Sequence, residues 1–318
     1  MDIHRQQIPK KFSDVLKILI CYYDSYGLPP LDDGIFLPVQ AGKAIADRDL
    51  HIQGDDEVNG QPCDNISDKN PTYSEFTALY WAWKNLKKLY PDVKYVGWTH
   101  YRRFFAFNEK MYFESRIWKP VEEIKDYRID PQKITGILES GKVIVAKKDT
   151  FHLPLRMQYS LAHNSEDYRT LKKVIKEKFP DYYDDFINVM EKNNKMFSFC
   201  MFIMKYEDFE KYCEWIFSVL AELEPLVPFQ CYNPYQKRVL AFMAERLFNV
   251  YIRKNKIKTE ELNVYLYMNL PSRKSTFRKI FSCAARLYWY VFRMLKYLRK
   301  ELIFRLIPAG SEKNSPKS

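Results

Sequence analysis

Several residue patterns that mark common enzyme classes are missing from this chain. Its 318 residues include only 9 Gly and 5 His, and they contain no P-loop, no G-x-G-x-x-G fingerprint, no G-x-S-x-G elbow and no H-E-x-x-H pair. The 6 Cys show neither C-x-x-C spacing nor a metal-ligand rhythm, so we expect reduced cysteines that pack in the interior. Residues 1–13 are charged and lack an apolar run. No secretory signal is visible there, and we expect a cytoplasmic location.

An excess of one charge is also missing from most of the chain. The formal net charge is +11, but residues 271–318 carry twelve Lys or Arg against two Glu, and the preceding residues hold 39 basic and 38 acidic side chains. A neutral body argues against a nucleic acid partner, because that binding depends on many contacts from Lys and Arg to phosphates. With 47% apolar and 16% aromatic residues, the body has ample material for a sizeable core.

The basic segment near the end has a helical pattern. Basic residues recur there every seven positions and share one stripe of a helix, and these are Lys279, Arg286, Arg293 and Lys300. Arg286, Arg293 and Lys296 interrupt the apolar run well short of the roughly 20 residues that a membrane span requires. We therefore predict a basic amphipathic helix over 271–307 that lies on the anionic inner face of the cell membrane. The alternative is a helix docked on the body with solvated basic side chains.

Strand and helix patterns alternate through residues 15–270. Apolar runs typical of buried strands occur at 16–23, 94–99, 143–146 and 196–204. Apolar residues at helical spacing cover about 72–88, 166–192, 206–224 and 234–253. This alternation predicts an α/β domain with an open, mostly parallel central sheet flanked by helices. Outside it we expect a flexible stretch at 1–14 and a disordered tail at 308–318.

The most unusual chemistry lies between residues 64 and 105. A polar loop leads into the helix at about 72, where Thr72 and Glu75 have the spacing of a capping box. The strand at 94–99 then runs into His100, Tyr101, Arg102 and Arg103. If extended geometry continues, His100 and Arg102 point to one side and Tyr101 and Arg103 to the other.

This strand end has two interpretations. Ligands of open α/β sheets bind beyond the carboxyl ends of the strands, and guanidinium groups pair bidentately with phosphate. His100, Arg102 and Arg103 are therefore candidates for an anion site. The alternative is a satisfied core histidine at His100 and a surface ion pair at Arg103.

Other polar residues have two interpretations as well. Asn65, Ser67 and Asn70 suit sugar hydroxyls, because amides and hydroxyls both donate and accept, but they also suit a plain turn. Asp55 and Asp56 are candidates for holding Mg²⁺ or Mn²⁺ against a diphosphate, although such acidic pairs also arise by chance.

Acids that could act as a base are few. Glu245 is an acid in an otherwise apolar helical stretch, where it could pair with Arg238 or Arg246 or serve as a base. Asp64, at the start of the polar loop, and His100 are the other candidates for catalysis.

Three strings together resemble a known bacterial family. Asp64-Asn65-Ile66-Ser67-Asp68-Lys69-Asn70-Pro71, Tyr80-Trp81-Ala82-Trp83-Lys84-Asn85 and His100-Tyr101-Arg102-Arg103 are similar to a domain-of-unknown-function family found in capsule, exopolysaccharide and O-antigen gene clusters. The similarity covers roughly residues 15–255. Two features depart from the family pattern: Glu57 to Cys63 separate the Gly-Asp-Asp turn from the Asn-Ile-Ser string, and Cys200 stands where Asn is common.

The resemblance implies an activity. The family includes galactofuranosyltransferase domains, so a GT-A-like glycosyltransferase that uses a nucleotide-activated sugar, with UDP as the expected nucleotide, is implied. Arg102 or Arg103 would bind the diphosphate, with Asn65, Ser67 and Asn70 around the donor. We expect a membrane-peripheral enzyme that adds one sugar to a lipid-linked glycan. The alternative is a non-catalytic glycan-binding or scaffold protein of the same assembly complex.

Overall fold

The chain forms an α/β body around one large sheet. The computed structural model describes residues 10–23, 34–107 and 115–268. Within these residues ten strands join in one sheet, and its main path is β13-β9-β12-β6-β1-β2-β3. Its strands are β1 (Leu16–Tyr22), β2 (Phe36–Gln40), β3 (Gln53–Gly54), β6 (Tyr95–His100), β7 (Arg103–Phe105), β8 (Arg116–Pro120), β9 (Val143–Ala146), β12 (Phe202–Lys205), β13 (Thr259–Leu262) and β14 (Val264–Met268).

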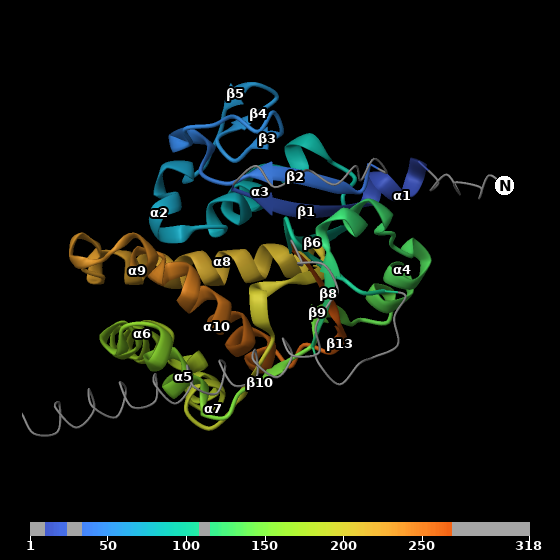
Figure 1. Ribbon diagram of the computed structural model, residues 1–318. Coiled ribbons are helices and arrows are strands. Elements are labelled where there is room, and N and C mark those ends of the chain that lie inside the picture. Colours follow the sequence, from blue (N-terminus) through green and yellow to red (C-terminus); the bar gives the residue numbers. More distant parts are fainter. Residues whose placement is uncertain (1–9, 24–33, 108–114, 269–318) are drawn as a thin grey trace, which may run out of the picture.

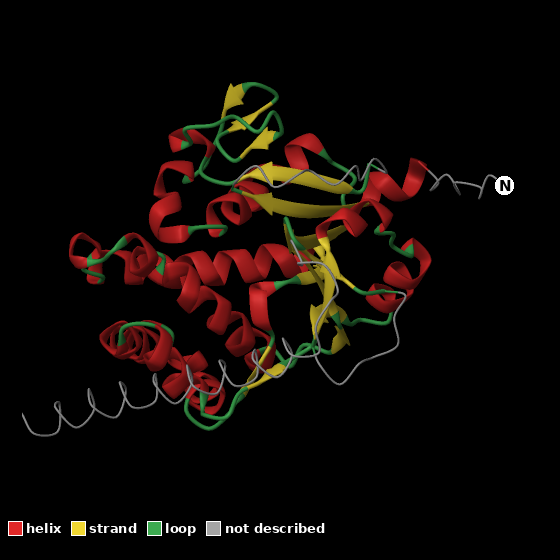
Figure 2. Ribbon diagram, viewed as in Figure 1, coloured by secondary structure: helices red, strands yellow, loops and turns green. Residues whose placement is uncertain are grey.

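Short ribbons and helices complete the body. The two ribbons pair β4 (Glu57–Val58) with β5 (Gln61–Pro62) and β10 (Asp149–Thr150) with β11 (Lys195–Met196). The α-helices are α1 (Lys10–Val15), α2 (Asn70–Tyr73), α3 (Phe76–Leu89), α4 (Pro131–Glu139), α5 (Leu155–Ala162), α6 (Ser165–Lys178), α7 (Tyr183–Met190), α8 (Tyr206–Leu223), α9 (Pro234–Lys237) and α10 (Val239–Lys254). Figure 2 shows helices on both sides of the strands.

Strand β1 lies at the centre of the sheet and is buried along its whole length. It pairs in parallel with β2 and with β6, and parallel pairing also joins β2 to β3, β9 to β13 and β8 to β14. Strand β12 runs antiparallel to both of its neighbours, β6 and β9. The α/β class and the mostly parallel sheet predicted from the sequence are confirmed.

Two apolar cores cover the two faces of the sheet. Alternate residues of β1 point to opposite faces, so Leu19 joins one core and Ile18 and Ile20 join the other. The larger core is covered by α3, α6, α7, α8 and α10, and the smaller one by α4 and the β7–β14 ribbon. Figure 1 shows α8 and α10 on one side of the sheet and α4 on the other. The helix faces that the sequence predicted to be apolar therefore meet the sheet.

Helix α1 begins at Lys10, and the flexibility expected for 1–14 stays a prediction. Two other expectations about individual elements are wrong. The helix predicted from about 72 divides into α2 and α3 at Ser74, whose φ is 49°. The strand predicted over 196–204 is interrupted by a helical turn, η5 (Ser198–Cys200). At the last two places tertiary contacts hold backbone conformations that the local sequence does not announce.

The membrane-surface prediction falls on residues that the structure does not describe. The helix predicted over 271–307, with Lys279, Arg286, Arg293 and Lys300, lies outside the described ranges. Among the helices within those ranges, none combines the length and the hydrophobicity needed to cross a membrane.

Candidate active site at the carboxyl edge of the sheet

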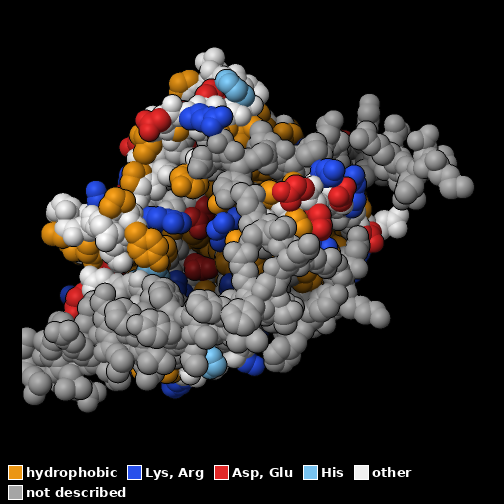
Figure 3. Space-filling model, in the orientation of Figure 1, with side chains coloured by type: hydrophobic (Ala, Val, Ile, Leu, Met, Phe, Trp, Pro, Cys, Tyr) orange, Lys and Arg blue, Asp and Glu red, His pale blue; other side chains and the backbone are white. Residues whose placement is uncertain are grey.

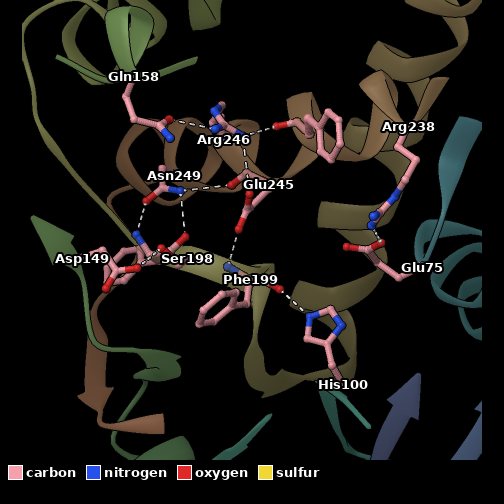
Figure 4. Close-up of polar contacts among 12 residues, drawn as sticks. Glu75, His100, Asp149, Gln158, Ser198, Phe199, Arg238, Glu245, Arg246 and Asn249 are labelled. Atoms are coloured by element: carbon pink, nitrogen blue, oxygen red, sulfur yellow. Dashed lines mark hydrogen bonds and ion pairs between the residues drawn. The ribbon is translucent and has the colours of Figure 1, made fainter. Parts of the chain in front are cut away.

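The carboxyl ends of β1 and β6 meet at one edge of the sheet, with Cys21 opposite His100. Strand β12 runs antiparallel to β6, so the turn that precedes β12 reaches the same edge. Figure 3 shows acidic and basic side chains gathered in a hollow near the centre of the face in view. Figure 4 shows how polar side chains from β6, η5 and α10 converge. Ligands of open α/β sheets bind beyond this edge, so it is the candidate active site.

A left-handed turn at Phe199 and Cys200, just before β12, lies at the site. Phe199 has φ 71° and the next residue, Cys200, has φ 51°. Each such residue costs about 1–3 kcal/mol and persists only where the surroundings hold it. Here the Phe199 N–H donates to Glu245 Oε1 at 2.6 Å, and the Phe199 carbonyl lies 2.8 Å from His100 Nε2. Both backbone groups of Phe199 are thus held by side chains from distant elements (Figure 4).

His100 is a buried, neutral histidine. Burial, with the nearby positive charge of Arg103 second, lowers the pKa of His100 to about 3. Its Nε2–H therefore donates to the Phe199 carbonyl at neutral pH. This bond fixes the orientation of the ring at the sheet edge. The structure shows His100 positioning Phe199, and a catalytic role for His100 stays a prediction.

Arg103 lies on the same side of the sheet as His100. The expectation that the chain continues extended after His100 is wrong, because it turns at Tyr101 and Arg102 and returns as β7. His100 and Arg103 are therefore a cross-strand pair of the resulting hairpin. His100 therefore shares its side of the sheet with Arg103, and not with Arg102 as the sequence predicted.

The Arg103 guanidinium is poorly satisfied by the protein. Within the described residues it forms no ion pair, and its Nε is buried without a hydrogen-bond partner. Burial, followed by the charge of Arg102, lowers the pKa of Arg103 to about 10, while Glu75 and Glu245 oppose this shift. Arg103 stays charged at neutral pH between two carboxylates that it does not pair with closely. Buried guanidinium groups with free donors are typical of anion sites.

The Phe199 ring lies close to two arginines. The guanidinium carbon of Arg103 is 4.2 Å from the ring centre, and that of Arg116 is 4.7 Å away. Asp149 pairs with Arg116 and also accepts the hydroxyls of Ser115 and Ser198. This network fixes Arg116 and the start of the turn. Sequence patterns do not point to Asp149, because its partners come from two segments that are distant from it along the chain.

Glu245 faces the site from helix α10. Its side chain is 26% exposed, and its Oε2 lies 3.4 Å from Arg246 Nη1. Arg246 is itself buried and donates to Gln158 Oε1 and to the carbonyl of Phe242. One oxygen of Glu245 is committed to Phe199, and the other keeps only a long contact with Arg246. Glu245 can therefore still accept a proton or a hydrogen bond from a ligand.

Glu75 and Arg238 form a second charged pair, 3.6 Å apart. The capping box predicted for Thr72 and Glu75 is wrong, because Thr72 lies inside α2 and its hydroxyl donates to the Lys69 carbonyl. Glu75 instead occupies the N-cap position of α3, where its side chain makes no capping bond. The break at Ser74 turns Glu75 toward Arg238, whose Nε donates to Ser74 Oγ at 2.8 Å. Sequence reasoning did not identify this pair.

The polar loop at 64–70 is held by its own hydrogen bonds. Ser67 is fully buried, and its hydroxyl donates to Asp55 and accepts from the Ala44 N–H. Asn65 accepts the Ser67 N–H at 3.0 Å and donates to the Cys63 carbonyl at 2.8 Å. Asn70 donates to the Ser74 carbonyl at 2.9 Å. The structure gives these side chains the turn-forming role, and Asn70 stabilises the break that aims Glu75.

Asp55 and Asp56, the candidates for a metal site, differ in their surroundings. Asp55 is fully buried and accepts the N–H groups of Gly42 and Lys43 as well as the Ser67 hydroxyl. Both Asp55 oxygens are occupied, whereas Asp56 Oδ1 is buried without a hydrogen-bond partner. In the part of the chain that the structure describes, no group of three His, Cys, Asp or Glu side chains could hold a metal ion.

Asp64 lies outside the cluster at the sheet edge. Its side chain is exposed and accepts the Tyr80 hydroxyl at 3.1 Å, while its carbonyl accepts from Asn85. Both partners belong to α3. Of the three acid–base candidates, the structure brings only Glu245 to the edge with a free oxygen.

The comparisons with known proteins agree with this fold. Residues 17–256 match the family described as Domain of unknown function (DUF4422), so the chain belongs to that family. Among solved structures, the chain is similar to the apo structure of WbbM, a bifunctional glycosyltransferase, with a TM-score of 0.69 and 28% sequence identity. The match covers 83% of this chain and 48% of the WbbM chain, so the chain spans about half the length of that relative. No curated protein matches.

These findings confirm the family that the sequence strings indicated. They also confirm the α/β fold of the GT-A-like type, a mixed and mostly parallel sheet with helices on both faces. The family match ends at residue 256, so it includes Glu75, Arg103, Arg238 and Glu245.

Proposed function

We propose that the chain is a glycosyltransferase that moves a sugar from a nucleotide-sugar donor to a glycan acceptor. The observation that carries this proposal is Arg103 at the sheet edge, a half-buried guanidinium that forms no ion pair among the described residues, has a buried Nε without a partner, and feels the charges of Glu75 and Glu245. A guanidinium can bind the diphosphate of the donor, and a carboxylate near it can accept the proton of the acceptor hydroxyl. The similarity to WbbM, which is a glycosyltransferase, supports the same class.

Arg103 would bind the diphosphate of the donor, with Arg102 next to it in the hairpin turn. Two N–H groups of a guanidinium can bind two phosphate oxygens at once, and burial strengthens such bonds. As the bond to the sugar breaks, negative charge grows on the leaving diphosphate and Arg103 stabilises it. A divalent cation at Asp56 stays a prediction, and this proposal includes no metal-dependent step.

Glu245 would act as the base. In an inverting transfer the acceptor hydroxyl gives its proton to a carboxylate, its oxygen bonds to the anomeric carbon, and the nucleoside diphosphate leaves. The Phe199 N–H fixes one oxygen of Glu245 and the other is available for that proton. Glu75, which lies near Arg238, is the second carboxylate that could accept it.

Donor and acceptor follow from the family resemblance together with the sequence. We propose a UDP-sugar, with galactofuranose as the first candidate, and a lipid-linked glycan of capsule, exopolysaccharide or O-antigen synthesis. The basic segment 271–307 would hold the enzyme at the inner face of the cell membrane, where such an acceptor is located.

Ligand-observed NMR on the purified full chain tests this function. UDP, GDP, UDP-galactofuranose, UDP-galactopyranose and UDP-glucose are added in turn, first with Mg²⁺ and then with EDTA. Selective binding of one nucleotide supports a transferase and defines the donor. Folded protein that binds none of them would instead indicate the glycan-binding scaffold.

A further inference from the structure

An aromatic surface borders the candidate site. It consists of His163, Tyr235 and Phe242, and we name it the aromatic platform. The rings of His163 and Phe242 stack with centroids 4.0 Å apart and planes 23° apart, and the Tyr235 ring lies 5.2 Å from that of Phe242. Tyr235 is 52% exposed, although large aromatic side chains usually bury most of their surface. The proposed donor site does not account for this exposure.

Helix α10 joins the platform to the catalytic carboxylate. Phe242 and Glu245 are three residues apart on this helix, which places their Cβ atoms about 5–6 Å apart on one face. Arg238, at the start of the helix, has its guanidinium carbon 5.5 Å from the centre of the Phe242 ring. Phe242 and Glu245 are therefore close enough for one sugar ring to contact both, and the Arg238–Glu75 pair lies beside the platform.

Flat rings bordered by charged groups suit a saccharide. One face of a sugar ring carries C–H groups that pack on an aromatic ring, while the hydroxyls need donors and acceptors around the edge. Arg238 supplies donors, Glu75 and Glu245 supply acceptors, and the Tyr235 hydroxyl supplies both. An apolar peptide would offer no hydrogen bonds to the remaining donors and acceptors of these groups, which sugar hydroxyls can bind.

We propose that the aromatic platform is the acceptor subsite, where a sugar ring stacks on the exposed Tyr235 ring beside Phe242 and presents one hydroxyl to Glu245. This inference deepens the proposed function and rests on it. The donor approaches from Arg103 and the acceptor from α9 and α10, so the two meet at Glu245. Tyr235 is here a binding residue that does not touch the donor.

Saturation-transfer NMR with two simple probes, methyl β-D-galactopyranoside and methyl β-D-glucopyranoside, tests the platform. The wild-type chain should transfer saturation to the C–H protons on one sugar face. Tyr235→Ala should weaken binding of the preferred glycoside about tenfold, as truncation of an aromatic anchor does. Tyr235→Phe keeps the ring and should retain binding. Trp118→Ala is the matched control, because Trp118 is 47% exposed on β8, away from α9 and α10.

UDP binding, measured in the same samples, separates the two proposals. The platform proposal is overturned if Tyr235→Ala binds the glycosides as wild type does, or if folded wild-type protein contacts neither probe. It is also overturned if UDP alone displaces the glycoside, because the rings would then hold the base of the donor. If wild type binds a glycoside through Tyr235 but binds no nucleotide, the transferase proposal fails, while the platform is still a sugar-binding site.

Discussion

Glu245 on α10 accepts the backbone N–H of Phe199 at 2.6 Å. This one bond joins the catalytic candidate to the left-handed turn before β12. His100 binds the carbonyl of the same residue from β6, so three elements that are distant in sequence meet at Phe199. The ring of Phe199 in turn lies under the guanidinium of Arg103. The turn therefore sets the positions of both groups to which we assign chemistry.

Replacing Arg103 should weaken nucleotide binding. Hydrogen bonds to a charged group contribute about 1.5–3 kcal/mol, so Arg103→Ala should raise the Kd for UDP by roughly 10- to 100-fold. Arg103→Lys should retain only part of the wild-type affinity for UDP, because an ammonium cannot bind two oxygens in the geometry of a guanidinium. Titration calorimetry measures both. Arg169→Ala, which removes a surface pair with Glu166, is the control; equal affinity in Arg103→Ala would remove this residue from the site.

Replacing Glu245 should slow transfer without loss of donor binding. The amide oxygen of Glu245→Gln can still accept the Phe199 N–H, so the turn should stay intact. A general base typically contributes about 10²–10⁴-fold to the rate, and the initial rate of UDP release should fall by that factor. Glu75→Gln is measured beside it. A large loss in Glu75→Gln alone would transfer the role of base to Glu75.

The buried His100 should make stability depend on pH. Its pKa is about 3 in the folded chain and near 6.5 when exposed, so the unfolded state binds more protons between these values. The contribution of neutral His100 to the free energy of unfolding is fully present above about pH 6.5 and is lost as the pH falls toward the folded-state pKa. From this residue alone, the free energy of unfolding should drop by about 2 kcal/mol between neutral pH and pH 5.

Urea unfolding of wild type and His100→Gln at pH 7.5 and pH 5.0 measures this contribution. A glutamine side chain can donate to the Phe199 carbonyl but does not titrate. The variant should therefore lose less stability than wild type on acidification, by about 2 kcal/mol. Equal losses in the two proteins would mean that His100 is not held neutral.

The two neighbouring aspartates should differ in their effect on stability. Asp55→Asn places an amide N–H where two backbone N–H groups and a hydroxyl now donate, so at least one donor loses its partner. We expect a loss of about 1–3 kcal/mol in the free energy of unfolding. Asp56→Asn should be close to neutral, because burial raises the pKa of Asp56 and disfavours its charged form. Chemical denaturation of both variants tests this contrast.

The basic segment should govern membrane attachment. Removal of residues 272–318 takes away most of the positive charge and should release the protein from anionic liposomes, while neutral liposomes bind neither form. Flotation assays at low and high salt measure this. A full-length variant with Lys279, Arg286, Arg293 and Lys300 replaced by Gln tests the charge without the deletion. Unchanged flotation of both altered proteins would contradict the membrane-surface prediction.

The parts of the fold that could be predicted are those with a strong local pattern. Strand β1 is one apolar run, and α8 carries apolar residues at helical spacing, so sequence alone defined both. The hairpin turn at Tyr101 and Arg102 and the left-handed turn at Phe199 lack the Gly, Pro or Asn that marks turns. Contacts from distant residues hold these two places, and a local pattern cannot show them.

The same distinction applies to the site. Arg103 was proposed because it follows the end of a buried strand, where ligands of such sheets bind, and Glu245 because it is an acid in an otherwise apolar helix. Glu75 and Arg238 were not, since their pairing depends on the break at Ser74 and on the packing of α10 against α2. Asn65 and Ser67 were expected near the donor, yet Asn and Ser readily bond to nearby backbone and adjacent loops, and here they do.

Release of UDP from UDP-galactofuranose by the purified full chain, with bacterial membrane lipids as acceptor, tests the central claim most directly. The account predicts release that requires the lipid fraction in wild type and is lost in Arg103→Ala. A folded wild-type protein that consumes neither this donor nor any other UDP- or GDP-sugar, with the same lipids present, would contradict it.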